Sequence, residues 1–458
     1  MAAATDLHVG WMLDVVGVPP PGVPVMLTPR GLKNHIAIIA QSGSGKSFML
    51  GRLIEEIASK TRARFVILDP NSDFIKLSEV DPLAWSNSRL QPWFDPGDTL
   101  LNFQKRWAPL EFDLITNRDP ESLGLKHALA HITPISLSWA QLSNSEQANY
   151  LEFSMIADPM EMYSLHQVTS FVERKSKENK NAALSPTLER FVQCAGALWG
   201  STLGKEDALD FPSDWPVSEI ARAPGEVSTT AALNLYGRAH ELNGLDIFDR
   251  GEEKDALNSK VRHLGEAKSP KRILLVDLAS LPGYRQRLVV ADAALAALWD
   301  VARESWISAI KEPSEKDSRF PVFIVVDEAH NLAPAEPESD TARIVLDTLV
   351  RIATEGRKYG LFLILVTQRP SRLHPSILSQ CDNLCLLKMN NRLDLQLVEN
   401  MFGFLPSGMV ERTRNFRTGD ALLCGNLVEK PVYLHAAPRR TAEGGRNLED
   451  GFWLQDPV

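Results

Sequence analysis

Residues 35–47 of the chain read HIAIIAQSGSGKS, and this stretch decides the fold class. The apolar run at 35–40 predicts a short strand buried in a parallel sheet, because polar and glycine-rich residues bound it. A helical pattern follows from Phe48 to Ser59, and a second apolar run occupies residues 64–68. Strand, glycine-rich loop, helix and strand form a βαβ unit, so a parallel α/β sheet is expected.

The loop after the first run matches the pattern G-x-x-x-x-G-K-[ST], except that Ala40 stands in place of the first glycine. Gly43 and Gly45 allow backbone N–H groups to curl around phosphates, while Lys46 reaches the β and γ oxygens of a nucleoside triphosphate. Ser47 supplies a hydroxyl to Mg²⁺, and the loop opens a helix whose N-terminus favours anions. We therefore expect ATP and Mg²⁺ as cofactors. The expected nucleotide-binding residues are Gln41, Ser42, Gly43, Ser44, Gly45, Lys46, Ser47 and Phe48.

A pair of acids follows another apolar run, VFIVV at 322–326. A strand of this kind delivers its last side chains to the carboxyl edge of an open α/β sheet, where ligands bind. Asp327 is expected to hold Mg²⁺ through water, in addition to Ser47. Glu328 is expected to polarise the attacking water, so the pair predicts hydrolysis rather than passive binding. The alternative is that both are ordinary loop acids.

Three more polar residues lie at the ends of predicted elements, and each has two interpretations. Gln368 follows the run at 361–366, where its amide either senses the γ-phosphate and orients water or caps the backbone. Arg357 ends a predicted helix, either as a partner of the helix dipole or as an arginine finger for a neighbouring subunit's nucleotide. Asp69 ends the run beside the phosphate loop and either assists the metal or caps a helix.

The composition excludes several classes of protein. Of 458 residues, 44% are hydrophobic and 23% are charged, which excludes wholesale disorder. The net charge of -9 argues against a uniformly basic surface for nucleic acid but allows a local basic lining. Four scattered cysteines point to a reducing, cytoplasmic compartment. No membrane span is expected, because Asp292 and Asp300 interrupt the longest apolar stretch, at 288–302.

The order of these patterns predicts an α/β fold with a mostly parallel central sheet that helices cover on both faces. Between about 95 and 270, apolar residues recur at helical spacing without alternating strands, which favours an inserted α-helical subdomain. Later strands are expected at 273–277, 322–326, 361–366, 384–387 and 421–424. The expected boundaries are a short N-terminal segment at 1–30, a first core part at 31–95, the helical insertion at 96–270, a second core part at 271–438 and a C-terminal tail at 439–458.

With these residues assembled, the chain resembles the HerA-type ATPases of the FtsK/HerA branch of RecA-like P-loop motors. The blocks that carry the resemblance are HIAIIAQSGSGKS at 35–47, LDPNSDF at 68–74, LLVDLASL at 274–281, VVDEAHNLAP at 325–334 and RIATEGRKYGLFLILVTQRPSRLHPSILSQCDN at 351–383. The chain departs from the family in two places. Ala40 replaces the usual glycine, and only 39 residues precede it, so the family's N-terminal β-barrel is expected to be absent.

The resemblance implies a RecA-like core that assembles into a homohexameric ring, with ATP between subunits and double-stranded DNA threaded through a central pore. It also implies a role for each candidate residue: Walker A for Lys46 and Ser47, Walker B for Asp327 and Glu328, sensor for Gln368 and trans-acting finger for Arg357.

The expected function is therefore an ATP-hydrolysing hexameric DNA translocase or helicase-like motor. The resemblance implies that it works with a separately encoded nuclease or another effector, in DNA processing or anti-phage defence, and without a membrane partner. Two alternatives remain open at this point. One is an ATP-dependent ring scaffold that assembles and activates a defence effector, and the other is a conjugation- or secretion-type coupling ATPase.

Overall fold

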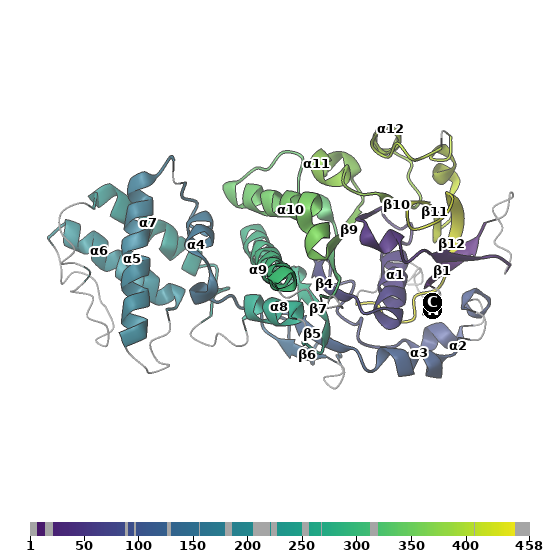
Figure 1. Ribbon diagram of the computed structural model, residues 1–458, viewed down its shortest axis with the longest axis horizontal. Helices are drawn as coiled ribbons and strands as arrows, with labels where there is room; N and C mark the ends of the chain where they lie inside the picture. Colours follow the sequence, from purple (N-terminus) through teal and green to yellow (C-terminus); the bar gives the residue numbers. More distant parts are fainter. Residues whose placement is uncertain are drawn as a thin grey trace, which may run out of the picture.

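A computed structural model places the chain in one large sheet with covering helices and a separate helical lobe (Figure 1). The described residues are 7–13, 22–87, 90–95, 98–125, 130–154, 156–178, 186–204, 220, 227–249, 256–266, 268–311, 319–406 and 408–444. Parts of the expected N-terminal segment, at 1–6 and 14–21, and residues 445–458 of the expected tail lie outside this set.

The sheet has twelve strands in the order β2-β1-β12-β11-β10-β3-β9-β8-β4-β7-β5-β6. The strands from β10 to β6 in this order run parallel, and β11, β12, β1 and β2 extend the sheet with antiparallel pairs. This confirms the predicted α/β fold with a mostly parallel sheet. The strand bounds are β1 Leu7–Met12, β2 Pro24–Leu27, β3 Ile36–Ile39, β4 Arg64–Asp69, β5 Glu111–Ile115, β6 His131–Thr133, β7 Lys271–Asp277, β8 Val322–Val326, β9 Leu361–Thr367, β10 Asn383–Leu386, β11 Asp420–Gly425 and β12 Val432–Ala436.

The helices lie on both faces of the sheet and in the lobe. Their bounds are α1 Lys46–Lys60, α2 Pro82–Ser86, α3 Leu100–Trp107, α4 Asn144–Tyr150, α5 Pro159–Glu178, α6 Leu188–Thr202, α7 Thr229–Asn243, α8 Leu257–Gly265, α9 Tyr284–Lys311, α10 Asp340–Tyr359, α11 Pro375–Leu378 and α12 Arg392–Met401. In Figure 1, α8, α9 and α10 lie on one side of the central strands, and α1 and α3 lie on the other.

Side chains of the central strands alternate between these two faces and so contribute to two hydrophobic cores. Val66 and Leu68 of β4 belong to the core that includes α9 and α10, whereas Phe65 and Ile67 belong to the core that includes α1 and α3. Because both faces are buried, the strands read as unbroken apolar runs in the sequence. Parallel pairing places the carboxyl ends of these strands along one edge, where the candidate residues follow.

The predicted helical insertion at 96–270 is wrong in its first part. β5 and β6 lie within it, and β5 pairs in parallel with β7 and with β6, so residues 111–115 and 131–133 extend the central sheet. These strands gave no clear pattern because β5 carries Asp113 at its centre and β6 is only three residues long. The helical part begins later, and α5, α6 and α7 form the lobe that Figure 1 shows beside the sheet.

The two terminal segments also differ from expectation. The segment at 1–30 contains β1 and β2, and β1 pairs with β12, so its described residues belong to the sheet. The segment after 438 is not an exposed tail where it is described. Arg439, Arg440 and Thr441 are buried, because they pack on α1 and on the turn that follows β4.

No described helix combines the length and the apolar character that a membrane crossing requires. The four cysteines, Cys194, Cys381, Cys385 and Cys424, are free and buried. Within the described residues, histidine, cysteine and acidic side chains do not gather in a group that could hold a metal ion by themselves.

Candidate nucleotide site

The glycine-rich loop connects the carboxyl end of β3 to the start of α1 at Lys46. Gly43 has a φ of 74° and Gly45 a φ of 95°, and both values lie in the left-handed region that favours glycine. The Ser44 hydroxyl donates a hydrogen bond of 2.6 Å to the Gln41 carbonyl, and this bond stabilises the turn. The loop therefore has the backbone conformation that the phosphate-binding pattern predicts.

The ammonium of Lys46 lies between two carboxylates at the end of β8. It donates to Asp327 Oδ1 at 2.9 Å and also to Glu328 Oε1. Burial alone would lower the pKa of Lys46, but the charges of Asp327 and Glu328 raise it above its ordinary value. The structure thus brings the predicted loop lysine and the predicted acid pair together at the carboxyl edge of the sheet.

The oxygens expected to hold Mg²⁺ lie in the same region. Asp327 is 1% exposed, and within the described part of the chain its Oδ2 atom has no hydrogen-bond partner. The Ser47 hydroxyl donates to Asp73 Oδ2 at 2.6 Å, which orients the serine oxygen. An orphaned buried carboxylate oxygen and a nearby hydroxyl fit a hard cation that takes its other ligands from phosphates and water.

Glu328 is held in an unusual conformation at the end of its strand. Its φ is 45°, in the left-handed region, which is rare for a residue with a side chain. The Gln368 amide donates to Glu328 Oε1, and His330 Nδ1 lies 3.5 Å from Glu328 Oε2. Gln368 follows β9 directly, so two neighbouring strands deliver the acid and the amide to one point.

A cavity of about 410 Å³ opens at this edge of the sheet. Among the expected residues, Gln41, Ser42, Gly43, Gly45, Lys46, Ser47, Phe48 and Gln368 line it. Ser44 does not, because it is 1% exposed and turned into the loop. Four further lining residues were not predicted: Asn71, Asp73, Thr418 and Glu443.

Only two of these four lining residues lie in a sequence motif. Asn71 and Asp73 belong to the block LDPNSDF that follows β4, so the resemblance could have identified them. Thr418 and Glu443 come from distant segments with no motif, and only the fold brings them to the phosphate loop. Burial raises the pKa of Glu443, and Arg439 partly opposes this.

Asp69 caps a turn in the structure. Its carboxylate accepts the backbone N–H groups of Asn71 at 3.1 Å and Phe74 at 2.8 Å. Burial raises the pKa of Asp69 to about 7, and the two N–H groups partly oppose this. Asp69 thereby holds the segment that carries Asp73 beside Ser47.

Arg357 lies away from the cavity of its own chain. It is the third-to-last residue of α10, which leads into the amino end of β9, whereas Gln368 follows the carboxyl end of that strand. Its guanidinium is partly exposed and pairs with Asp382 Oδ2 at 2.8 Å. The structure therefore does not bring Arg357 together with the other candidate residues within one chain.

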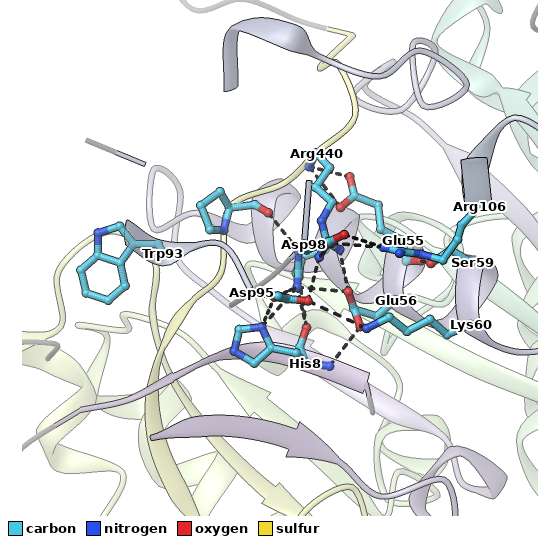
Figure 2. A network of polar contacts seen from close by, with 12 residues as sticks. His8, Glu55, Glu56, Ser59, Lys60, Trp93, Asp95, Asp98, Arg106 and Arg440 are labelled. Carbon is cyan, nitrogen blue, oxygen red and sulfur yellow. Dashed lines mark hydrogen bonds and ion pairs between the residues drawn. The ribbon is translucent and has the colours of Figure 1, made fainter. Parts of the chain in front are cut away.

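A buried network of charges anchors α1 behind the phosphate loop (Figure 2). Arg440 pairs with Glu56 at 2.6 Å, with Asp95 at 2.9 Å and with Asp98 at 2.7 Å. Arg52, one turn before Glu56 on α1, also pairs with Asp95, at 2.7 Å.

Figure 2 also shows His8 of β1 in this network, with its backbone N–H donating to Glu56 Oε2 at 3.0 Å. The network joins β1, α1, the acids Asp95 and Asp98, and the C-terminal segment. Buried charges are tolerated because each has opposite charges beside it. The C-terminal segment that carries Glu443 into the cavity is thereby fixed to the helix that begins with Lys46.

The fold and the site define a class, the P-loop ATPases. A family model described as "Helicase HerA, central domain" matches residues 7–297, and one described as "ATPase family associated with various cellular activities (AAA)" matches residues 287–389. The chain belongs to the HerA family.

Similar relatives bear the same family name. A DNA double-strand break repair helicase HerA of Pyrococcus furiosus is 24% identical over 414 residues, which cover 88% of this chain and 64% of the relative. A probable HerA helicase of Methanocaldococcus jannaschii is 23% identical over 436 residues, with coverage of 93% and 76%. This chain thus spans less than two thirds of the Pyrococcus relative's length.

Among solved structures, the conjugative coupling protein TrwB has a similar fold. One TrwB structure, in complex with sulphate, has a TM-score of 0.50 at 15% identity and covers 93% of this chain and 89% of its own. Another, in complex with ADP and Mg²⁺, has a TM-score of 0.50 at 14% identity, with coverage of 94% and 90%. At such identities the likeness extends to the fold alone.

Proposed function

We propose that this chain hydrolyses ATP with Mg²⁺ and uses the energy to move along double-stranded DNA. The observation that carries the hydrolysis is the cluster of Lys46, Asp327, Glu328 and Gln368 at the carboxyl edge of the sheet. The phosphate loop beside this cluster supplies N–H groups for a triphosphate. A positioned acid next to the γ-phosphate favours turnover over binding alone.

Each residue has a role in this proposal. A triphosphate in the cavity attracts the Lys46 ammonium and so releases Glu328 from its ion pair. Glu328 then accepts a proton from the attacking water, and Gln368 holds both the water and the carboxylate in place. Ser47 and Asp327 would hold Mg²⁺, which would supply positive charge to neutralise the phosphates.

DNA as the substrate and the ring assembly rest on family membership. Two relatives that cover most of this chain are named as a DNA double-strand break repair helicase HerA and a probable one. We infer a homohexameric ring in which Arg357 reaches the nucleotide of a neighbouring subunit, since it lies far from its own. A separate nuclease or other effector in DNA processing or defence, and a cytoplasmic location, complete the proposal.

ATPase rate with and without double-stranded DNA tests the motor, combined with sizing chromatography for the ring. A motor is expected to form a ring and to hydrolyse ATP faster when DNA is present. If the chain forms a ring but its ATPase rate is the same with and without DNA, the proposal is contradicted. That result would favour a scaffold that uses ATP as an assembly switch. Glu328→Gln serves as the control for contaminating ATPases, because it removes the proposed base.

A further inference from the structure

A short turn with two arginines follows Gln368. Arg369 precedes a 3-10 helix, η9 Pro370–Arg372, and both Arg369 and Arg372 are exposed. Neither guanidinium forms an ion pair or a hydrogen bond with any residue in the described ranges. No ion pair within the described residues therefore balances the charge of either side chain.

The turn is directly connected to the hydrolytic residues. Arg369 follows Gln368, whose amide donates to Glu328, and the Arg369 backbone N–H donates to Thr367 Oγ1 at 3.0 Å. The same hydroxyl lies 3.1 Å from His330 Nδ1. Burial lowers the pKa of His330, the Glu328 carboxylate partly opposes this, and the charges of Arg369, Lys46 and Arg372 lower it further.

A third cation extends this surface. The N-terminal end of α12 packs against η9, where the Ser371 N–H donates to Asp394 Oδ1 at 3.4 Å. Arg392, the first residue of α12, is exposed, and the described residues offer its side chain no ion-pair partner. We call Arg369, Arg372 and Arg392 the post-sensor patch. The positive end of the α12 dipole adds to its attraction for anions.

The surroundings of the patch do not neutralise it. The loop beside η9 carries Glu336, and Ala335 donates its N–H to the Arg372 carbonyl at 2.8 Å. Glu336 is exposed, and no ion pair joins it to the arginines within the described residues. Asp394 is 5% exposed and accepts a backbone N–H, so its charge is directed inward.

We propose that the post-sensor patch is a contact surface for the phosphate backbone of double-stranded DNA. Free guanidinium groups on a rigid turn suit phosphates, because a guanidinium offers several donors in a plane and stays charged. This inference rests on the proposed function and adds to it the place where the DNA is held. Since Gln368 and Arg369 are consecutive, a shift of Gln368 upon loss of the γ-phosphate moves the patch, and the patch moves the DNA.

The test measures binding of a fluorescent 30-base-pair duplex to the full chain with Mg²⁺ and ATPγS, over a range of salt concentrations. The variant Arg369→Gln/Arg372→Gln is expected to bind at least about tenfold more weakly at moderate salt, for every duplex sequence. Its plot of log affinity against log salt is expected to be shallower by about 1.8, because two phosphate contacts are lost. The lysine pair, Arg369→Lys/Arg372→Lys, is expected to recover most of the salt slope.

The matched control is Arg303→Gln. Arg303 is also exposed, but it lies in the C-terminal half of α9, toward the amino edge of the sheet. This variant is expected to bind DNA as the unaltered chain does. If the unaltered chain binds no DNA, the proposed function fails; if it binds DNA and the glutamine pair binds equally well, only the patch is wrong. Weakened ATPγS binding by the glutamine pair, with unchanged DNA affinity, would assign the arginines to the nucleotide instead.

Discussion

Lys46 and Asp327 are separated by 281 positions in the chain, yet the Lys46 ammonium donates to the Asp327 carboxylate at 2.9 Å. Parallel pairing makes this contact possible, because β3 and β8 both flank β9 and end at the same edge. In this arrangement the lysine compensates two buried acids. A bound triphosphate would offer the same ammonium a further set of anionic partners.

Substitution Lys46→Ala should weaken ATP binding as well as turnover. The lysine neutralises phosphate charge in the ground state and in the transition state, and without it two carboxylates repel the triphosphate. A charge-assisted hydrogen bond of about 1.5–3 kcal/mol corresponds to a loss of affinity of roughly 10–100-fold. Titration with a fluorescent ATP analogue measures this, and unchanged affinity would mean that the glycine-rich loop does not hold the nucleotide.

Substitution Glu328→Gln should separate binding from hydrolysis. The amide keeps the size of the side chain and still contacts Gln368, but it cannot accept a proton. Turnover is expected to fall by about two orders of magnitude or more, which is the usual contribution of a positioned base. ATP affinity should stay the same or rise, since one negative charge beside the γ-phosphate is gone. Near-normal steady-state turnover would contradict the role of Glu328.

Substitution Arg440→Met should destabilise the protein by about 3–5 kcal/mol, because it leaves Glu56 and its acidic neighbours partly uncompensated in a buried site. Denaturant unfolding followed by circular dichroism measures the change. Arg414→Met is the matched control, since Arg414 pairs with Glu411 on the surface and such pairs contribute only about 0.2–1 kcal/mol. Equal effects of the two substitutions would show that the network in Figure 2 does not anchor α1.

Asp69 predicts a dependence of stability on pH. Its pKa is raised by burial from 3.8 to about 7, so between these values the folded state holds a proton that the unfolded state has lost. The contribution of Asp69 to the free energy of unfolding therefore falls as pH rises from about 4 to about 7, by at most about 4 kcal/mol. Asp69→Asn should remove this component. The free energy of unfolding of the variant, relative to that of the unaltered protein, should therefore be higher at pH 8 than at pH 4. Identical pH profiles of the two proteins would contradict it.

The sequence predicts those strands and motifs that appear as a pattern of neighbouring residues. The strands β3, β4, β8 and β9 are buried on both faces, so unbroken apolar runs revealed them, and the motifs at their ends followed. β5 and β6 were missed because they lie near the sheet's edge, where short length and polar residues are tolerated. Glu443 could not be predicted from the sequence. The buried ion pairs of Arg440 bring its segment to the cavity, and ion pairs between residues far apart in the chain produce no characteristic spacing in the sequence.

Substitution Arg357→Ala tests the ring itself. If Arg357 only pairs with Asp382 on the surface, its loss should cost about 0.2–1 kcal/mol of stability and leave turnover intact. If it completes a neighbour's site, the variant should bind ATP and assemble normally but hydrolyse poorly. Arg351→Ala is the matched control on the same helix, because Arg351 is already engaged over the Trp299 ring, at 4.7 Å from its centroid.

Mixing two inactive variants, Arg357→Ala and Glu328→Gln, distinguishes a trans role from a cis role. In a mixed ring, an interface is intact when one subunit keeps Glu328 and its neighbour keeps Arg357, which random pairing yields at about a quarter of the interfaces. A trans-acting arginine should therefore restore part of the ATPase activity, whereas a residue that acts within its own chain should restore none. Mixed rings verified by a tag on one variant, yet without recovered activity, would assign Arg357 to its pair with Asp382 alone.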